Sequence, residues 1–330
     1  MELETGWIHL DAIPDGTLAF GGSAGDFQPG RHDLPAPMEG GVILQLVALS
    51  LFRAPPGFGT PGAAAVWEVL ACEERARVVP GMRLFSHPSP SCGICPACRS
   101  DAHAFCPDSL RRPSGPGWFS RQRVLHAWSA RRGSLVLPSD LDAGAASLLE
   151  PLSVVLRLER LFPRRDRVVV VGGGLPAILA GMALEGPRRR ILLGQDPDSR
   201  ASERGFHAVC RDSSTARLAL DGPADLVVLA DGDPASVRFA AELLAPGTAV
   251  ASFAAPEEAA DLPARIHAVG GSWRSVVGSG PDDWNLASRR LPALADRLAN
   301  LPVHRMELER AQEAAGFLDA DPALLRVELS

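Results

Sequence analysis

The sequence has 330 residues, 46% of them hydrophobic and 22% charged, which is typical of a folded globular protein large enough for two cores. Its formal net charge of −6 gives no indication of a nucleic-acid or anionic-membrane partner. All 33 basic residues are arginine, so no lysine is available as a Schiff base or general base.

The first residues, MELETGWIHLDAIPDG, are acidic and lack the basic-then-apolar pattern of a secretory signal. The longest uncharged apolar stretch, residues 168–184, is interrupted by the run Gly172-Gly173-Gly174 and by Pro176. It therefore predicts a strand, a turn and a helix, and we expect no membrane span. We expect a cytoplasmic protein, in a reducing compartment that disfavours structural disulfides.

Four of the six cysteines lie close together, with the spacing C-x2-C-x2-C-x7-C, at Cys92, Cys95, Cys98 and Cys106. Such short loops satisfy disulfide geometry poorly, whereas four thiolates on tight turns can converge on one tetrahedral ion. We therefore predict one structural Zn²⁺ per chain, with a C-x-x-C redox pair or a chance spacing as the alternatives. Four protein ligands leave no position for water or substrate, so this ion would stabilise a loop and take no part in catalysis.

A predicted strand of four valines is followed by a glycine turn and an apolar helix over residues 167–184. The turn fits the dinucleotide fingerprint G-x-G-x-x-A, in which the glycines permit a tight turn and a close approach to a pyrophosphate. The predicted cofactor-binding residues of this turn are Gly172, Gly173, Gly174, Leu175 and Ala177. The helix N-terminus would supply free amides to the phosphates. The alternative is an αβ layer with an incidental glycine turn.

Further predicted strands at residues 191–193, 225–230 and 249–253 alternate with helical segments, which indicates a parallel, doubly wound sheet. Asp196 follows the glycine turn at about the spacing of the acidic residue that binds the adenosine ribose, which favours NAD(H). A shift of one residue places Gln195 there instead, and Arg200 would then meet the 2′-phosphate of NADP(H). We therefore expect NAD(P)H as the cofactor, with a preference for NAD.

These features resemble the zinc-containing medium-chain dehydrogenases, the alcohol and polyol dehydrogenase superfamily, over nearly the whole chain. The lobe at about residues 90–110 matches the family's structural-zinc loop. The segment LLEPLSVVLRLER (148–160) resembles the polyol dehydrogenases, and MELERAQEAAGFL (306–318) matches the family's C-terminal helix region.

The resemblance implies an α/β protein of two domains. A GroES-like, β-rich catalytic domain would span residues 1–152 and 298–330, and a Rossmann-type cofactor domain residues 153–297. It also implies hydride transfer to or from NAD(P), a small-molecule substrate, and a homodimer or homotetramer.

The family's catalytic zinc site is not preserved in this sequence. Phe52 stands where the family has its cysteine ligand, and Ala54 replaces the relay serine or threonine. Ala63 and Ala64 replace the histidine ligand and its neighbouring glutamate. Glu150 resembles the family's carboxylate ligand, but one carboxylate cannot hold a zinc that normally needs three protein ligands. We therefore expect that the second zinc is absent.

Without this Lewis acid, the sequence favours reduction of a double bond that is already activated: C=C beside a carbonyl, C=N or C=O. Phe52, Trp67 and the two alanines predict an apolar substrate pocket. Glu150 is the candidate acid or cation-binding carboxylate, because burial raises a carboxyl pKa; its alternative role is to stabilise a helix N-terminus. Ser50 is a candidate for orienting a substrate carbonyl, or else a buried, hydrogen-bonded hydroxyl.

Two other functions stay open. The chain could be an ordinary zinc-dependent alcohol or polyol dehydrogenase whose ligands lie elsewhere in the sequence. It could also be a scaffold that binds the cofactor without catalysing a reaction.

Overall fold

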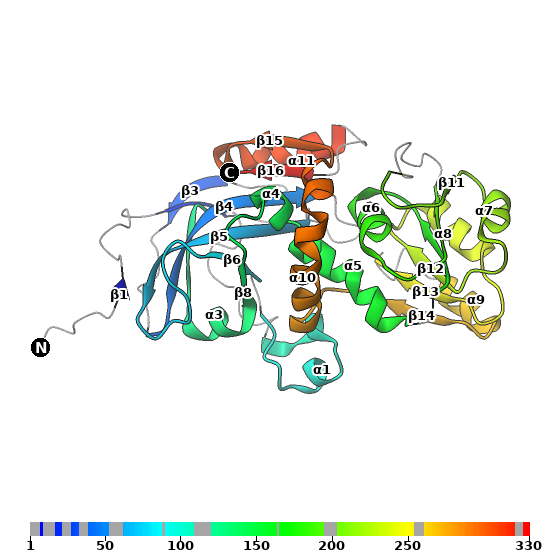
Figure 1. The fold of residues 1–330 in the computed structure, drawn as a ribbon, viewed down its shortest axis with the longest axis horizontal. Helices are drawn as coiled ribbons and strands as arrows, with labels where there is room; N and C mark the ends of the chain where they lie inside the picture. The colour runs from blue at the N-terminus through cyan, green and yellow to red at the C-terminus, as the bar shows by residue number, and fades with distance from the viewer. Residues whose placement is uncertain are drawn as a thin grey trace, which may run out of the picture. The chain divides into compact units, whose positions relative to one another are not determined.

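The structure is a computed structural model that describes residues 7–8, 17–21, 28–32, 39–52, 62–87, 90–108, 120–163, 165–194, 203–253, 261–320 and 326–330. The chain divides into two compact units (Figure 1). In its described part, unit 1 comprises residues up to Phe52 together with Gly62–Glu150 and Ser279–Ser330, and unit 2 comprises Pro151–Gly278.

Unit 1 is built on an eight-stranded sheet whose main path has the order β15-β16-β4-β5-β6-β8, with β1 added to β5 and β7 to β4. All the pairs are antiparallel except β15 with β16. The two longest strands are rich in apolar residues, which suit a buried sheet. The strands are β1 (Trp7–Ile8), β4 (Val42–Phe52), β5 (Gly62–Glu73), β6 (Arg83–Ser86), β7 (Gln122–Leu125), β8 (Ser134–Leu137), β15 (Val303–Met306) and β16 (Arg326–Leu329).

A separate two-stranded sheet pairs β2 (Thr17–Gly21) with β3 (Gln28–His32). The helical segments of unit 1 are short except for α10. They are α1 (Pro96–Arg99), η2 (His103–Phe105), α3 (Ala127–Gly133), α4 (Ala143–Ala146), α10 (Pro281–Ala299), η4 (Leu308–Arg310) and α11 (Ala311–Ala320).

Helix α10 belongs to unit 1, whereas the sequence-based boundary at residue 298 assigns most of it to the cofactor domain. The helix packs against α4, and the Trp284 ring meets Phe85 edge-on at a centroid distance of 5.6 Å. Its N-terminus is capped by Asp283, whose carboxylate accepts the Gly280 amide at 3.0 Å. The amphipathic pattern of α10 identifies a buried face but not which of the two cores that face covers.

A hydrophobic core cluster of unit 1 contains Trp67, which is fully buried. The guanidinium of Arg123, on β7, stands 5.3 Å from the centre of the Trp67 ring. Burial lowers the pKa of Arg123 to about 10. Trp67 therefore lies in the core, in contact with a buried cation. This contact explains the tryptophan, for which the sequence suggests only the filling of a substrate pocket.

Unit 2 is a six-stranded parallel sheet with the order β11-β10-β9-β12-β13-β14. If the six strands are numbered 1 to 6 in chain order, their spatial order is 3-2-1-4-5-6, which is the arrangement of dinucleotide-binding sheets. In such sheets the ligand binds at the point where the strand order reverses, which here lies between β9 and β12. The strands are β9 (Arg167–Val171), β10 (Arg189–Leu193), β11 (Ala208–Cys210), β12 (Leu226–Leu229), β13 (Ala249–Ser252) and β14 (Ser272–Ser275).

The helices of unit 2 alternate with its strands, as the sequence predicts. They are α6 (Gly174–Ala183), α7 (Ser213–Leu220), α8 (Pro234–Glu242) and α9 (Leu262–Ala268), and α5 (Leu149–Leu161) leads into the unit. A mainly antiparallel unit and a separate parallel, doubly wound unit confirm the predicted α/β fold class.

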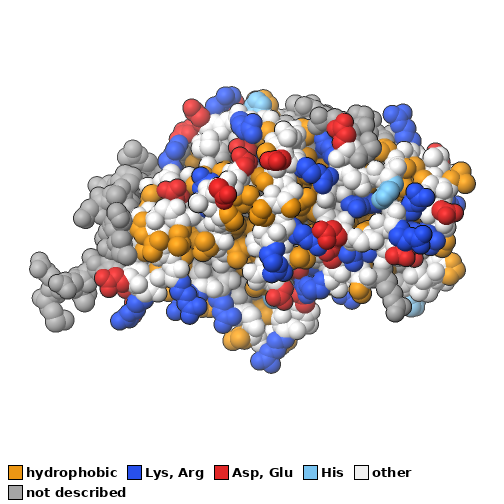
Figure 2. All heavy atoms as spheres, viewed as in Figure 1, with side chains coloured by type: hydrophobic (Ala, Val, Ile, Leu, Met, Phe, Trp, Pro, Cys, Tyr) orange, Lys and Arg blue, Asp and Glu red, His pale blue; other side chains and the backbone are white. Residues whose placement is uncertain are grey.

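Acidic and basic side chains are interspersed on the face shown in Figure 2. None of the helices in the described ranges is both long and apolar enough to cross a bilayer.

Candidate functional site

The four clustered cysteines converge as predicted: the Sγ atoms of Cys92, Cys95, Cys98 and Cys106 all lie within 4.8 Å of one another. Cys98 Sγ is 3.5 Å from Cys95 Sγ and 3.9 Å from Cys92 Sγ. A disulfide needs a separation of about 2 Å. Tetrahedral zinc with Zn–S bonds of about 2.3 Å places its sulfur atoms about 3.8 Å apart. The cluster therefore has the spacing of a metal site.

Backbone amides also point at these sulfur atoms. The amide of Cys95 donates to Cys92 Sγ at 3.3 Å, and that of Cys92 donates to Cys106 Sγ at the same distance. Amide donors stabilise the thiolate form that binds metal. The residues therefore fit a structural zinc with four protein ligands, which would hold the lobe together and leave no position open for substrate.

The glycine turn of unit 2 has the backbone that the fingerprint requires. Gly172 and Gly174 have φ angles of +99° and +75°, which favour glycine. Gly173 and Gly174 are exposed, while Leu175 and Ala177 are buried, Ala177 completely. The exposed backbone and the small buried residue fit a dinucleotide pyrophosphate at the N-terminus of α6.

Asp231, immediately after β12, is a residue at this turn that sequence reasoning missed. Its Oδ2 accepts the Gly173 amide at 2.7 Å, and a side chain added at Gly172 would lie 2.4 Å from the same atom. The Asp231 carboxylate thus accepts the hydrogen bond of the Gly173 amide, which could otherwise donate to a phosphate of the cofactor. The sequence signal for Asp231 is its position at the carboxyl end of β12, because cofactors of parallel sheets bind at the carboxyl ends of the strands.

The residues expected to select between NAD and NADP, Asp196 and Arg200, lie outside the described residues, as does Ala54.

The residues that stand in place of the family's catalytic zinc ligands in the sequence, Phe52 and Ala63, lie on β4 and β5. In their register Phe52 faces Gly62, Leu51 faces Ala63 and Ser50 faces Ala64. Phenylalanine and alanine offer no metal ligand. Across the described part of the chain, the four cysteines are the only group of three or more His, Cys, Asp or Glu residues arranged to share an ion.

Glu150, in the first turn of α5, is held by a directed chain of hydrogen bonds within unit 1. Trp284 Nε1 donates to Ser279 Oγ at 2.8 Å, and Ser279 Oγ donates to Glu150 Oε1 at 2.8 Å. The indole nitrogen can only donate, and the Ser279 hydroxyl donates its own hydrogen onward to Oε1, so this chain runs from the tryptophan to the carboxyl group. Glu150 Oε1 is therefore an acceptor, and a proton bound by Glu150 resides on Oε2.

Burial raises the pKa of Glu150 from 4.5 to about 7, although the hydrogen bonds from Ser279 and Trp284 lower it in part. A helix N-terminus would instead favour the charged form. Desolvation therefore dominates, and the group can exchange a proton near neutral pH.

His87 lies beside this carboxyl group. Its Nε2 is 3.9 Å from Glu150 Oε1, and its ring stacks on Trp284 with a centroid distance of 5.3 Å and an angle of 25°. The sequence contains no motif that unites His87, Ser279 and Trp284, because segments far apart in the chain bring them together.

Ser50, the second candidate catalytic residue, is fully buried in a polar cluster. Its Oγ is 2.5 Å from Ser147 Oγ and accepts a hydrogen bond from Arg326 Nη1 at 3.1 Å. Arg326 also donates to the Gly144 carbonyl. These contacts match the alternative role of Ser50, that of a buried, hydrogen-bonded hydroxyl.

Comparison with known proteins gives matches in structure only. No sequence-family model and no curated protein matches the chain. An alcohol dehydrogenase from Thermotoga maritima is similar over 95% of this chain and 99% of its own, with 16% identity and a TM-score of 0.77.

Two similar structures contain a nicotinamide cofactor. The alcohol dehydrogenase RspB from E. coli, complexed with NADH, matches over 96% of this chain and 100% of its own (16% identity, TM-score 0.79). A zinc-binding dehydrogenase from Sinorhizobium meliloti, bound to NADP, matches over 96% and 99% (19% identity, TM-score 0.72). The chain has the fold of the zinc-binding alcohol dehydrogenases, which confirms the predicted resemblance.

Proposed function

We propose that this protein is an NAD(P)H-dependent reductase with one structural zinc and no catalytic zinc. Its substrate would be a small molecule with an activated C=C, C=N or C=O bond. Three observations support the proposal: the dehydrogenase fold, the glycine turn at the point where the sheet order reverses, and the four-cysteine cluster.

The cofactor, when bound, supplies the hydride. The exposed Gly174 backbone at the start of α6 would bind its pyrophosphate, whereas the Gly173 amide is held by Asp231. Ala177 lets α6 pack closely on the sheet. We propose NADH as the preferred form, on the basis of Asp196 in the sequence.

The observation that supports the proposal most strongly is Glu150, whose carboxyl group accepts a hydrogen bond from Ser279 and has a pKa raised to about 7. Reduction of a C=C, a C=O or a neutral C=N bond adds a hydride and a proton, and without a metal the protein must supply that proton, whereas an iminium ion needs only the hydride. Glu150 would deliver it from Oε2, while the Ser279 hydroxyl stabilises the carboxylate that forms.

His87 is placed to restore that proton. Its side chain is 21% exposed, and its Nε2 is 3.9 Å from Oε1, the carboxyl oxygen that accepts from Ser279, so a proton would have to reach Oε2 indirectly. This spacing would allow transfer after a small side-chain movement or through one water molecule.

Single-turnover mixing of the protein with NADH or NADPH and a panel of enals, enones and iminium ions, and in parallel with NAD+ or NADP+ and a panel of alcohols, tests the proposal. We expect oxidation of the cofactor with at least one activated double bond and no reaction with simple alcohols. Cofactor binding without hydride transfer to any class would favour the scaffold function. Alcohol oxidation that depends on a second zinc would favour the zinc-dependent alternative.

A further inference from the structure

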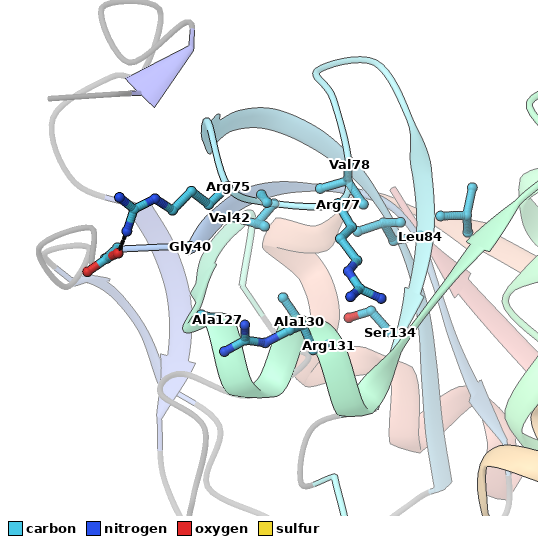
Figure 3. Close-up of a pocket in the computed structure, with 13 residues that line it drawn as sticks. Gly40, Val42, Arg75, Arg77, Val78, Leu84, Ala127, Ala130, Arg131 and Ser134 are labelled. Atoms are coloured by element: carbon cyan, nitrogen blue, oxygen red, sulfur yellow. Dashed lines mark hydrogen bonds and ion pairs between the residues drawn. The ribbon is translucent and has the colours of Figure 1, made fainter.

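Unit 1 contains a cavity of about 410 Å³ that is separate from the Glu150 site (Figure 3). It lies between β4, the turn that follows β5, helix α3 and the start of β8. Its apolar lining includes Val42, Val78, Leu84 and Ala130. This volume is within the range of small-molecule sites.

The polar groups of the cavity are mainly cationic. Arg75, Arg77 and Arg131 contribute to its lining together with one acidic residue, Glu39. Arg75 is already paired with Glu39. In the described part of the chain, Arg77 and Arg131 have no ion-pair partner. The cavity therefore has two guanidinium groups available for an anion.

Ser134 is a second and independent sign of a ligand. Its Oγ is buried and has no hydrogen-bond partner. Figure 3 shows this hydroxyl and the Arg77 guanidinium pointing toward one another. A buried hydroxyl without a partner is costly, and an acceptor shared with Arg77 would satisfy it.

We propose that this cavity binds an organic carboxylate with an apolar body. The carboxylate would accept hydrogen bonds from Arg77 and Ser134, with Arg131 adding a second positive charge. The apolar body would cover Val78, Ala130 and Val136, of which Val136 is the most exposed. An inorganic anion would leave the exposed part of this apolar lining in contact with water, which favours an amphipathic ligand.

Titration calorimetry with naphthoate tests this site, with ADP-ribose present so that the glycine turn is occupied. We expect the double variant Arg77→Gln/Arg131→Gln to bind naphthoate about tenfold more weakly or worse, because charge-assisted hydrogen bonds are lost. Ala130→Phe should also weaken binding, by filling the apolar part without changing the charge. Both arginines are exposed, so the double variant should fold normally.

Two controls make the test specific. Arg188→Gln removes an exposed arginine of unit 2 and should leave naphthoate affinity unchanged. Naphthalenemethanol, the neutral analogue, should bind at least about tenfold more weakly than naphthoate. The proposal is overturned if the double variant binds as tightly as the unaltered protein, if the neutral analogue binds equally well, or if ADP-ribose abolishes naphthoate binding.

Discussion

The Ser279 hydroxyl donates a 2.8 Å hydrogen bond to Oε1 of Glu150, and its own oxygen accepts the Trp284 indole N–H. This arrangement fixes the direction of the chain and assigns the exchangeable proton of Glu150 to Oε2. It also stabilises the charged form of a carboxyl group whose pKa burial raises to about 7.

Ser279→Ala should therefore raise the pKa of Glu150 further, because a hydrogen bond to the carboxylate is lost. If protonated Glu150 is the acid, the pH at which single-turnover reduction begins to slow should move upward. Ser288→Ala, on the exposed side of α10, is the matched control. A pH profile that stays in place, or moves downward, would argue against Glu150 as the titrating group.

Glu150 should also make the stability of the protein depend on pH. Its carboxyl group keeps a proton to higher pH in the folded state than in the unfolded state, so folding stability falls as pH rises from 4.5 to about 7. Between pH 4.5 and 8 the free energy of unfolding should fall less for Glu150→Gln than for the unaltered protein. The two falls should differ by up to roughly 3 kcal/mol. Urea unfolding at several pH values measures this difference. Parallel stability curves would show that Glu150 has an ordinary pKa.

The four-cysteine cluster should bind one zinc per chain and stabilise its lobe. Cys98→Ser should release that zinc and lower the free energy of unfolding by several kcal/mol, because binding of a structural metal contributes directly to folding. Cys210→Ser changes a buried cysteine outside the cluster and should retain the metal. Elemental analysis and thermal unfolding provide the two readouts. Two zinc ions in the unaltered protein would contradict the absence of a catalytic zinc.

Asp231 should weaken cofactor binding, because its carboxylate holds the Gly173 amide and would repel a pyrophosphate. Asp231→Asn keeps the size of the side chain and removes its charge, so the NADH dissociation constant should fall severalfold. Asp282→Asn, at an exposed position on α10, is the control. NADH fluorescence titration measures both variants. Weaker binding to Asp231→Asn would mean that the carboxylate contacts the cofactor directly.

The sequence predicts the parts of this fold that depend on local spacing. The cysteine spacing identifies the metal cluster, and the four valines followed by Gly172 and Gly174 identify the nucleotide turn, because both sites are formed by short continuous segments. The sequence also shows directly that Ala63 and Ala64 cannot bind a metal.

The surroundings of Glu150 could not be predicted in the same way. Ser279 and Trp284 lie more than a hundred residues from Glu150 in the chain and reach it only because α10 packs in unit 1. Neither the periodicity of α10 nor the residue types of its first turn specify that packing. Asp231 was similarly missed, since only the sheet register places the end of β12 beside the glycine turn.

Single-turnover hydride transfer by Glu150→Gln tests the central claim most directly. The variant keeps a hydrogen-bond acceptor for Ser279 but cannot donate an acidic proton, so the rate constant should fall by about 100-fold or more with NADH affinity unchanged. The rate of the unaltered protein should decline as pH rises through about 7. Glu74→Gln, an exposed substitution in unit 1, should behave like the unaltered protein. An unchanged rate in Glu150→Gln would contradict the assignment of Glu150 as the proton donor.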